Sequence, residues 1–146
     1  MQIEGSFAFK APREMIFQRM TDPECLNAAV PGCERLVSVG ENEYEMTLKI
    51  GIAAVKGTYA GKIRIDDMVV PEAYRMIVEG NSGPGNIKGV GQIRLVEEGN
   101  GTKVLYSGDV QVSGKIAAVG NRFLGMTAKM MVGKFFSEMA KQIDKP

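Results

Sequence analysis

The segment GNSGPGNIKGVG, residues 80–91, has the glycine-rich composition of a phosphate-binding loop. In such loops glycine lets backbone N–H groups approach an anion, and the helix that follows contributes partial positive charge. Here the next residues, QIRLVEE, alternate apolar Ile93 and Leu95 with polar side chains, which indicates a strand. No Gly-Lys-Ser or Gly-Lys-Thr follows the glycines. Residues 81–85 therefore predict a hairpin connection rather than a nucleotide site.

Catalytic chemistry has few candidate residues in this chain. It contains no histidine, which removes imidazole bases, histidine-activated nucleophiles and histidine metal ligands. The carboxylates of Glu45, Glu79 and Asp109 alternate with apolar neighbours, so they are expected on solvated strand faces. Cys25 and Cys33 lack metal-ligand spacing and are expected to be reduced, structural thiols. We predict no catalytic residue and no metal site.

Composition places the protein among single-domain globular proteins. A chain of 146 residues forms one domain, and a net charge of +1 gives no electrostatic case for nucleic acid binding. We find no signal peptide and no apolar run long enough to cross a bilayer. A cytoplasmic protein is expected.

The order of elements predicts an α+β fold. Residues 3–9 alternate as a strand, and residues 12–20 and 22–30 have the proline and capping signals of two short helices. From Glu34 to Val112 we expect about six antiparallel strands. Residues 114–141 contain no proline and predict one long helix that crosses the sheet.

Glycine recurs in the apolar register of four predicted strands, at Gly61, Gly80, Gly89, Gly91 and Gly108. Glycine inside a strand marks a bend or a close approach of another group. Two interpretations stay open, since the glycines either let the long helix pack closely or leave a hollow beneath it. We predict an elongated apolar cavity of several hundred Å³. Changing Gly89 or Gly108 to leucine is expected to block it and leave the fold largely intact.

The apolar register of the strands and the methionine-rich last helix supply the predicted lining of this cavity. Tyr59, Tyr106 and Asn121 are candidates for polar contacts to a head group, because a few hydroxyls or amides orient a ligand in an apolar pocket. The full predicted set is Phe17, Leu26, Met46, Leu48, Tyr59, Gly61, Met76, Gly89, Tyr106, Gly108, Asn121, Phe123, Met130 and Met131.

Three short motifs occur in the order and context of a known family. They are PGCE at residues 31–34, KGTYAGK at residues 56–62 and GKIAAVGNR at residues 114–122. With the element order, they make the chain resemble the START-like helix-grip superfamily (SRPBCC) and, within it, the carbon monoxide dehydrogenase CoxG family. The resemblance covers nearly the whole chain, from Ile3 to about Lys141. Ser113 departs from the glycine pair expected before the last motif.

This resemblance implies a single START-like domain over residues 1–146, with about seven curved antiparallel strands around a long C-terminal helix. It also implies an accessory protein of molybdenum-containing carbon monoxide dehydrogenases, acting in membrane recruitment or quinone delivery without catalysis of its own. The function expected first is therefore a carrier of an isoprenoid quinone or another lipid, with no covalent or metal cofactor. A cyclase or dehydratase of the same fold and a docking module without ligand are the alternatives.

Basic residues suggest a contact surface on the predicted last helix. Lys115, Arg122 and Lys129 recur at intervals of seven, close to two helical turns, so they are expected along one side. A solvated stripe is one interpretation. The other is a weak contact with an anionic membrane, which would place the protein peripherally at the inner face of the cell membrane.

Overall fold

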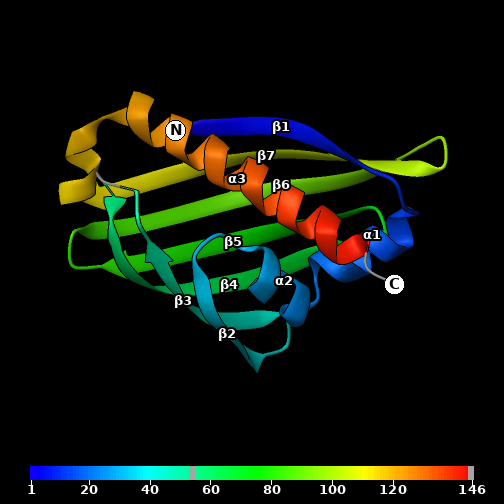
Figure 1. Cartoon of the computed structure of the whole chain (residues 1–146), viewed down its shortest axis with the longest axis horizontal. Coiled ribbons are helices and arrows are strands. Elements are labelled where there is room, and N and C mark those ends of the chain that lie inside the picture. Colours follow the sequence, from blue (N-terminus) through cyan, green and yellow to red (C-terminus); the bar gives the residue numbers. More distant parts are fainter. Residues whose placement is uncertain (53–54, 145–146) are drawn as a thin grey trace.

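One curved antiparallel sheet forms most of the molecule, and its helices lie against one face and one end of it (Figure 1). The computed structural model describes residues 1–52 and 55–144. All neighbouring strands are antiparallel, as expected from the short connections. In spatial order they are β1 (Gln2–Phe9), β7 (Gly101–Gly114), β6 (Gly85–Glu98), β5 (Ala73–Ser82), β4 (Gly57–Val69), β3 (Glu43–Ile50) and β2 (Cys33–Gly40).

Two short helices, α1 (Arg13–Met20) and α2 (Pro23–Ala29), follow β1 as predicted. Asp22 caps α2 by accepting a hydrogen bond from the Cys25 backbone N–H at 3.0 Å, and Pro23 occupies the first turn. After α2 the chain turns at Gly32, whose φ of 78° is in the left-handed region. A β-carbon there would lie 2.5 Å from the Lys49 carbonyl oxygen, so the turn of the PGCE motif requires glycine.

The glycine-rich segment of residues 80–91 forms a hairpin, which confirms the strand interpretation. β5 ends at Ser82 and β6 begins at Gly85, and the Ser82 hydroxyl donates a hydrogen bond to the Gly85 carbonyl at 2.9 Å. No helix follows that could hold a phosphate, because β6 continues to Glu98.

The last helix is shorter than predicted. A 3₁₀ helix, η2 (Lys115–Val119), precedes α3 (Asn121–Ile143), and Gly120 separates the two with a φ of 91°. The glycine in this conformation breaks the helical path, so Lys115 does not share the helical phase of Arg122 and Lys129. The prediction of one continuous basic stripe is therefore wrong at Lys115.

α3 crosses the concave face of the sheet diagonally (Figure 1). Its second half is fixed by an aromatic cluster, in which the Phe136 ring stacks on Phe7 and on Tyr106 with centroids 5.4 Å apart in each pair. No helix in residues 1–52 and 55–144 is long and apolar enough to span a membrane.

Candidate functional site

Two adjoining apolar hollows lie between the sheet and α3. The first, which we call the Tyr74 hollow, has a volume of about 240 Å³ and borders α1, α2 and the second half of α3. The second, the Gly89 hollow, has a volume of about 310 Å³ and borders the first half of α3. Met76, Val78, Met131 and Val132 line both. Together they offer an elongated space of the size that ligand pockets have.

Strand register explains why the lining is apolar. On β3, β4 and β5 the inward positions alternate with outward polar ones, and β6 and β7 continue the pattern. Predicted residues Leu26, Met46, Met76, Tyr106 and Met131 border the Tyr74 hollow, whereas Leu48, Tyr59, Met76, Gly89 and Met131 border the Gly89 hollow.

The five inward glycines divide into two groups. A β-carbon on Gly80, Gly89 or Gly91 would meet nothing closer than 3.7 Å, and all three line the Gly89 hollow. At Gly108 it would lie 2.9 Å from the Val90 carbonyl oxygen, and at Gly61 it would lie 2.8 Å from two carbons of Met46. Both interpretations of the glycines therefore hold, the hollow for the first group and close packing for the second.

Gly61, Gly108 and Phe17 differ from their predicted place at the cavity wall. Met46 covers Gly61, and the backbone of β6 covers Gly108. Phe17 is buried and packs edge-on against Tyr74, with ring centroids 5.4 Å apart at 84°. These residues support the wall without bordering either hollow.

Asn121, Phe123 and Met130 were predicted to line the cavity, but they lie on the outside of α3. Asn121 is exposed at the first turn, and Phe123 and Met130 are 38% and 55% exposed. The inward side of the first half of α3 is formed instead by Leu124, Thr127, Ala128 and Met131. The prediction was wrong because the break at Gly120 sets the rotational phase of α3.

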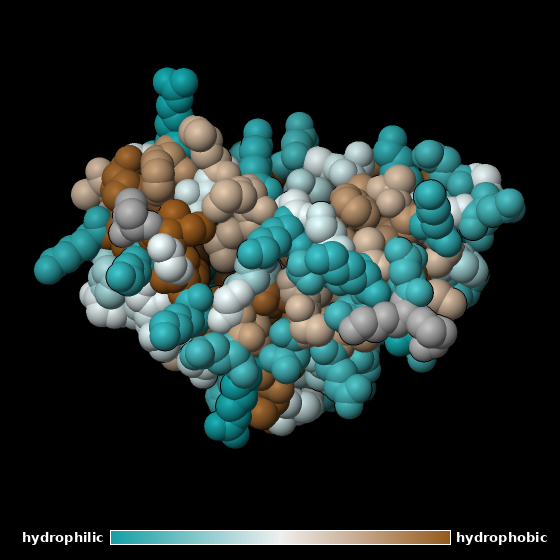
Figure 2. All heavy atoms as spheres, in the orientation of Figure 1, coloured by the Kyte–Doolittle hydropathy of each residue, from teal (hydrophilic) through white to brown (hydrophobic). Residues whose placement is uncertain are grey.

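Phe123 and Met130 join Met126, which is 66% exposed, in an apolar patch on the outer side of α3. Figure 2 shows hydrophobic side chains gathered at the end of the molecule where α3 begins, with hydrophilic side chains projecting around them. Arg122 and Lys129 are exposed on the same helix. We call these five residues the α3 patch. Its charges were predicted from the sequence, but its apolar centre was not.

The hydroxyl of Tyr59 has a structural partner. It donates a hydrogen bond to the Val55 carbonyl oxygen at 2.7 Å, and both residues are buried. Tyr59→Phe would leave that carbonyl without its donor, so we expect a loss of roughly 1–3 kcal/mol in the free energy of unfolding. Urea unfolding measures this. An unchanged midpoint would contradict the assigned bond.

Tyr74 was not predicted as a site residue, yet it borders the hollow that we name after it. Its side chain is 2% exposed, and its hydroxyl has no hydrogen-bond partner within the described part of the chain. Burial raises the pKa of this phenol above its ordinary value, so it stays protonated. Alternation along β5 predicts that Tyr74 points inward but not that its hydroxyl lacks a partner.

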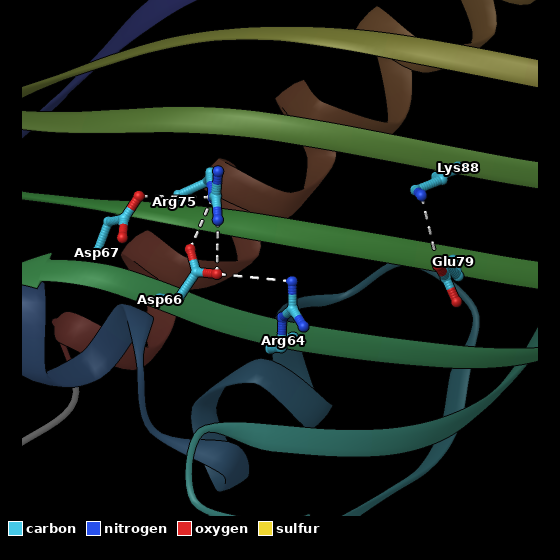
Figure 3. A network of polar contacts seen from close by, with 6 residues as sticks. All are labelled: Arg64, Asp66, Asp67, Arg75, Glu79 and Lys88. Carbon is cyan, nitrogen blue, oxygen red and sulfur yellow. Dashed lines mark hydrogen bonds and ion pairs between the residues drawn. The ribbon is translucent and has the colours of Figure 1, made fainter.

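The opposite face of the sheet is charged and largely paired (Figure 3). The guanidinium of Arg75 donates two hydrogen bonds to Asp66, at 2.7 and 2.8 Å, and these hold the pKa of that carboxyl below its usual value. A groove of about 560 Å³ lies on this face, larger than either hollow but lined by exposed ion-paired side chains such as Glu79 and Lys88, 3.9 Å apart.

The carboxylates considered for catalysis are engaged outside the hollows. Glu79 borders the Gly89 hollow, but its carboxylate pairs with Lys88 on the outer face. Glu45 is exposed, and Asp109 is ion-paired with the Met1 ammonium at 3.2 Å.

The two thiols and the acidic residues offer no other reactive centre. Burial raises the pKa values of the Cys25 and Cys33 thiols, which keeps them protonated and weakly nucleophilic. Among the described residues no group of three or more acidic, cysteine or histidine side chains could hold a metal ion.

Comparisons with known proteins agree with this architecture. Over residues 5–144 the sequence matches the carbon monoxide dehydrogenase family CoxG. A solved structure of a conserved protein from Geobacillus kaustophilus is 36% identical, with a TM-score of 0.94 over 98% of this chain and 95% of that one. No curated protein matches the sequence significantly.

More distant structures share the fold alone. A START superfamily protein from Mycobacterium smegmatis is 10% identical, with a TM-score of 0.77 over 98% of this chain and 97% of that one. A protein from Chromobacterium violaceum is 15% identical, with a TM-score of 0.74 over 99% and 98% of the two chains. The chain therefore has the START-like helix-grip fold.

Proposed function

The chain belongs to the carbon monoxide dehydrogenase CoxG family, and we propose that it is a non-enzymatic carrier that holds an apolar small molecule between its sheet and α3. The observation that carries this proposal is the pair of adjoining apolar hollows. A packed core leaves few voids larger than a water molecule, so hollows of about 240 and 310 Å³ need an occupant or a use.

The ligand class follows from the shape and chemistry of this space. Glycines remove side chains from one wall, and the flexible thioethers of Met76 and Met131 stand between the hollows. An isoprenoid quinone or another lipid with one head and one chain fits such a space. Each buried CH₂ contributes about 0.8 kcal/mol, so several buried units give slow release.

The family name supplies the proposed partner, a molybdenum-containing hydroxylase of the carbon monoxide dehydrogenase type. In this proposal the protein works in the cytoplasm and visits the inner face of the cell membrane through the α3 patch. It then links the quinone pool to the enzyme. The exposed apolar and basic residues of the patch support the membrane contact.

We expect the protein to retain a hydrophobic molecule when it is purified from its native host. Organic extraction followed by mass spectrometry identifies that molecule and its ratio to protein. Gly89→Leu is the matched control, because a leucine there projects into the Gly89 hollow and would exclude the ligand. A wild-type protein that stays empty although quinone is available would contradict the carrier and favour a docking module.

A further inference from the structure

The hydroxyl of Tyr74 is a buried donor without a partner in the described part of the chain, in a wall that is otherwise hydrocarbon and thioether. The hydroxyl of Tyr59, another inward tyrosine, is already bonded to Val55. In Tyr74 the ring is held edge-on by Phe17, and the side chain borders the Tyr74 hollow. A buried hydroxyl without a hydrogen bond is costly, and native structures keep such groups rarely.

The cost falls when a bound molecule supplies the missing acceptor. A neutral phenol donates one hydrogen bond, and a carbonyl oxygen accepts it without bringing charge into the hollow. The ligand would therefore find one polar contact in the Tyr74 hollow and apolar contacts elsewhere, which is how apolar pockets orient what they bind.

Charge in the walls restricts the ligand further. The described residues that line the two hollows include no lysine or arginine. The Met1 ammonium, at the edge of the Gly89 hollow, is already ion-paired with Asp109 at 3.2 Å. A carboxylate or phosphate buried here would lack a counter-charge, and burying an unpaired ion costs far more than one hydrogen bond returns.

We propose that Tyr74 is the specificity-determining residue of the cavity, which donates a hydrogen bond to a neutral carbonyl-type oxygen of the ligand head. The head then lies in the Tyr74 hollow and the chain in the Gly89 hollow. Uncharged carbonyl compounds are selected, and anionic lipids such as free fatty acids are excluded. This inference rests on the proposed carrier function and adds the chemical class that the carrier accepts.

Two probes of nearly equal shape test the hydrogen bond. Duroquinone and durene have the same tetramethylated ring, with and without the two carbonyl oxygens, and duroquinone has no free ring position for addition by Cys25 or Cys33. With delipidated wild type and Tyr74→Phe, we expect the variant to bind duroquinone about fivefold to tenfold more weakly. Durene binding should be equal in both. Equal duroquinone binding, or equal losses for both probes, would overturn the role of Tyr74.

A spectroscopic readout separates a hydrogen bond from a packing effect. The carbonyl stretch of isotope-labelled duroquinone is expected at lower frequency in wild type than in Tyr74→Phe, because a donated hydrogen bond weakens the C=O bond. The ligand-free variant should be at least as stable as wild type, since it loses an unpaired hydroxyl. An identical carbonyl frequency in both proteins would overturn the proposal.

A second pair of probes tests the exclusion of charge. The ketone undecanone should bind to wild type, and decanoate at pH 8 should not compete with it. Competition by decanoate would overturn the selection for neutral ligands and leave the carrier function standing. If wild type binds none of duroquinone, durene and undecanone, both the proposed function and the role of Tyr74 fail.

Discussion

Gly108→Leu is expected to abolish stable folding, whereas Gly89→Leu should fold and lose its ligand. Both glycines lie in the inward register of neighbouring strands, so the sequence pattern makes them equivalent. A β-carbon at Gly108 would lie 2.9 Å from the Val90 carbonyl oxygen and 3.3 Å from the Gly91 α-carbon, which are backbone atoms that cannot rotate away. At Gly89 the nearest atom would be a methyl carbon of Val110, at 3.8 Å.

The magnitudes decide between the two outcomes. Overpacking costs typically about 1–3 kcal/mol and more where backbone must move, against a total stability of about 5–15 kcal/mol for a domain. Gly108→Ala should therefore lose about 1–3 kcal/mol, and the leucine variant more than the sheet can absorb. Gly89→Leu should lose little, because its side chain enters the Gly89 hollow.

Urea unfolding and ligand occupancy after purification measure both effects. Gly133→Leu is the matched control, since Gly133 is exposed on α3 and a β-carbon there meets nothing within 4 Å. That change should retain the ligand and raise helix propensity. A stable Gly108→Leu protein, or a Gly89→Leu protein that keeps its full ligand content, would contradict the division of the glycines.

The strand register was predictable because period-two alternation is a local property of the sequence. Tyr44, Met46, Leu48 and Ile50 are all buried, as their alternation indicated. The hairpin at residues 80–91 was predictable for the same reason, since the alternation continues beyond its glycines. Capping of α2 by Asp22 followed from residue types alone.

The remaining features depend on contacts that no local pattern encodes. Whether an inward glycine faces space or backbone depends on how closely the neighbouring strand approaches, and Gly89 and Gly108 differ in this respect only in three dimensions. The phase of α3 depends on the backbone at Gly120, which turned Phe123 and Met130 outward. The unpaired hydroxyl of Tyr74 is visible only when its neighbours are known.

Wild-type protein is expected to sediment with anionic vesicles at low salt and to be released as salt is raised. Arg122 and Lys129 supply the charge, and each basic residue near an anionic surface contributes about 1 kcal/mol. Phe123, Met126 and Met130 supply apolar area that can enter the headgroup region. Salt screens the first contribution but not the second, so weak binding should remain at high salt.

Two variants separate these contributions. Arg122→Glu with Lys129→Glu should weaken binding to anionic vesicles by about 30-fold or more, because about 2 kcal/mol of attraction is lost. Serine at Phe123, Met126 and Met130 should remove the binding that persists at high salt. Lys49→Glu with Lys62→Glu is the matched control, since both lysines are exposed on β3 and β4 and the change in net charge is the same.

The position of the α3 patch gives this binding a consequence for the carrier. Phe123, Met126 and Met130 face outward, while Leu124, Thr127, Ala128 and Met131 line the Gly89 hollow from the same turns of α3. Docking by the patch would therefore hold the hollow about one helix diameter, roughly 10 Å, from the bilayer surface. Transfer of a quinone from vesicles to the protein should then slow in the serine variant as much as its binding weakens. Unchanged transfer with lost binding, or equal vesicle binding by all variants, would show that the patch does not deliver the hollow to the membrane.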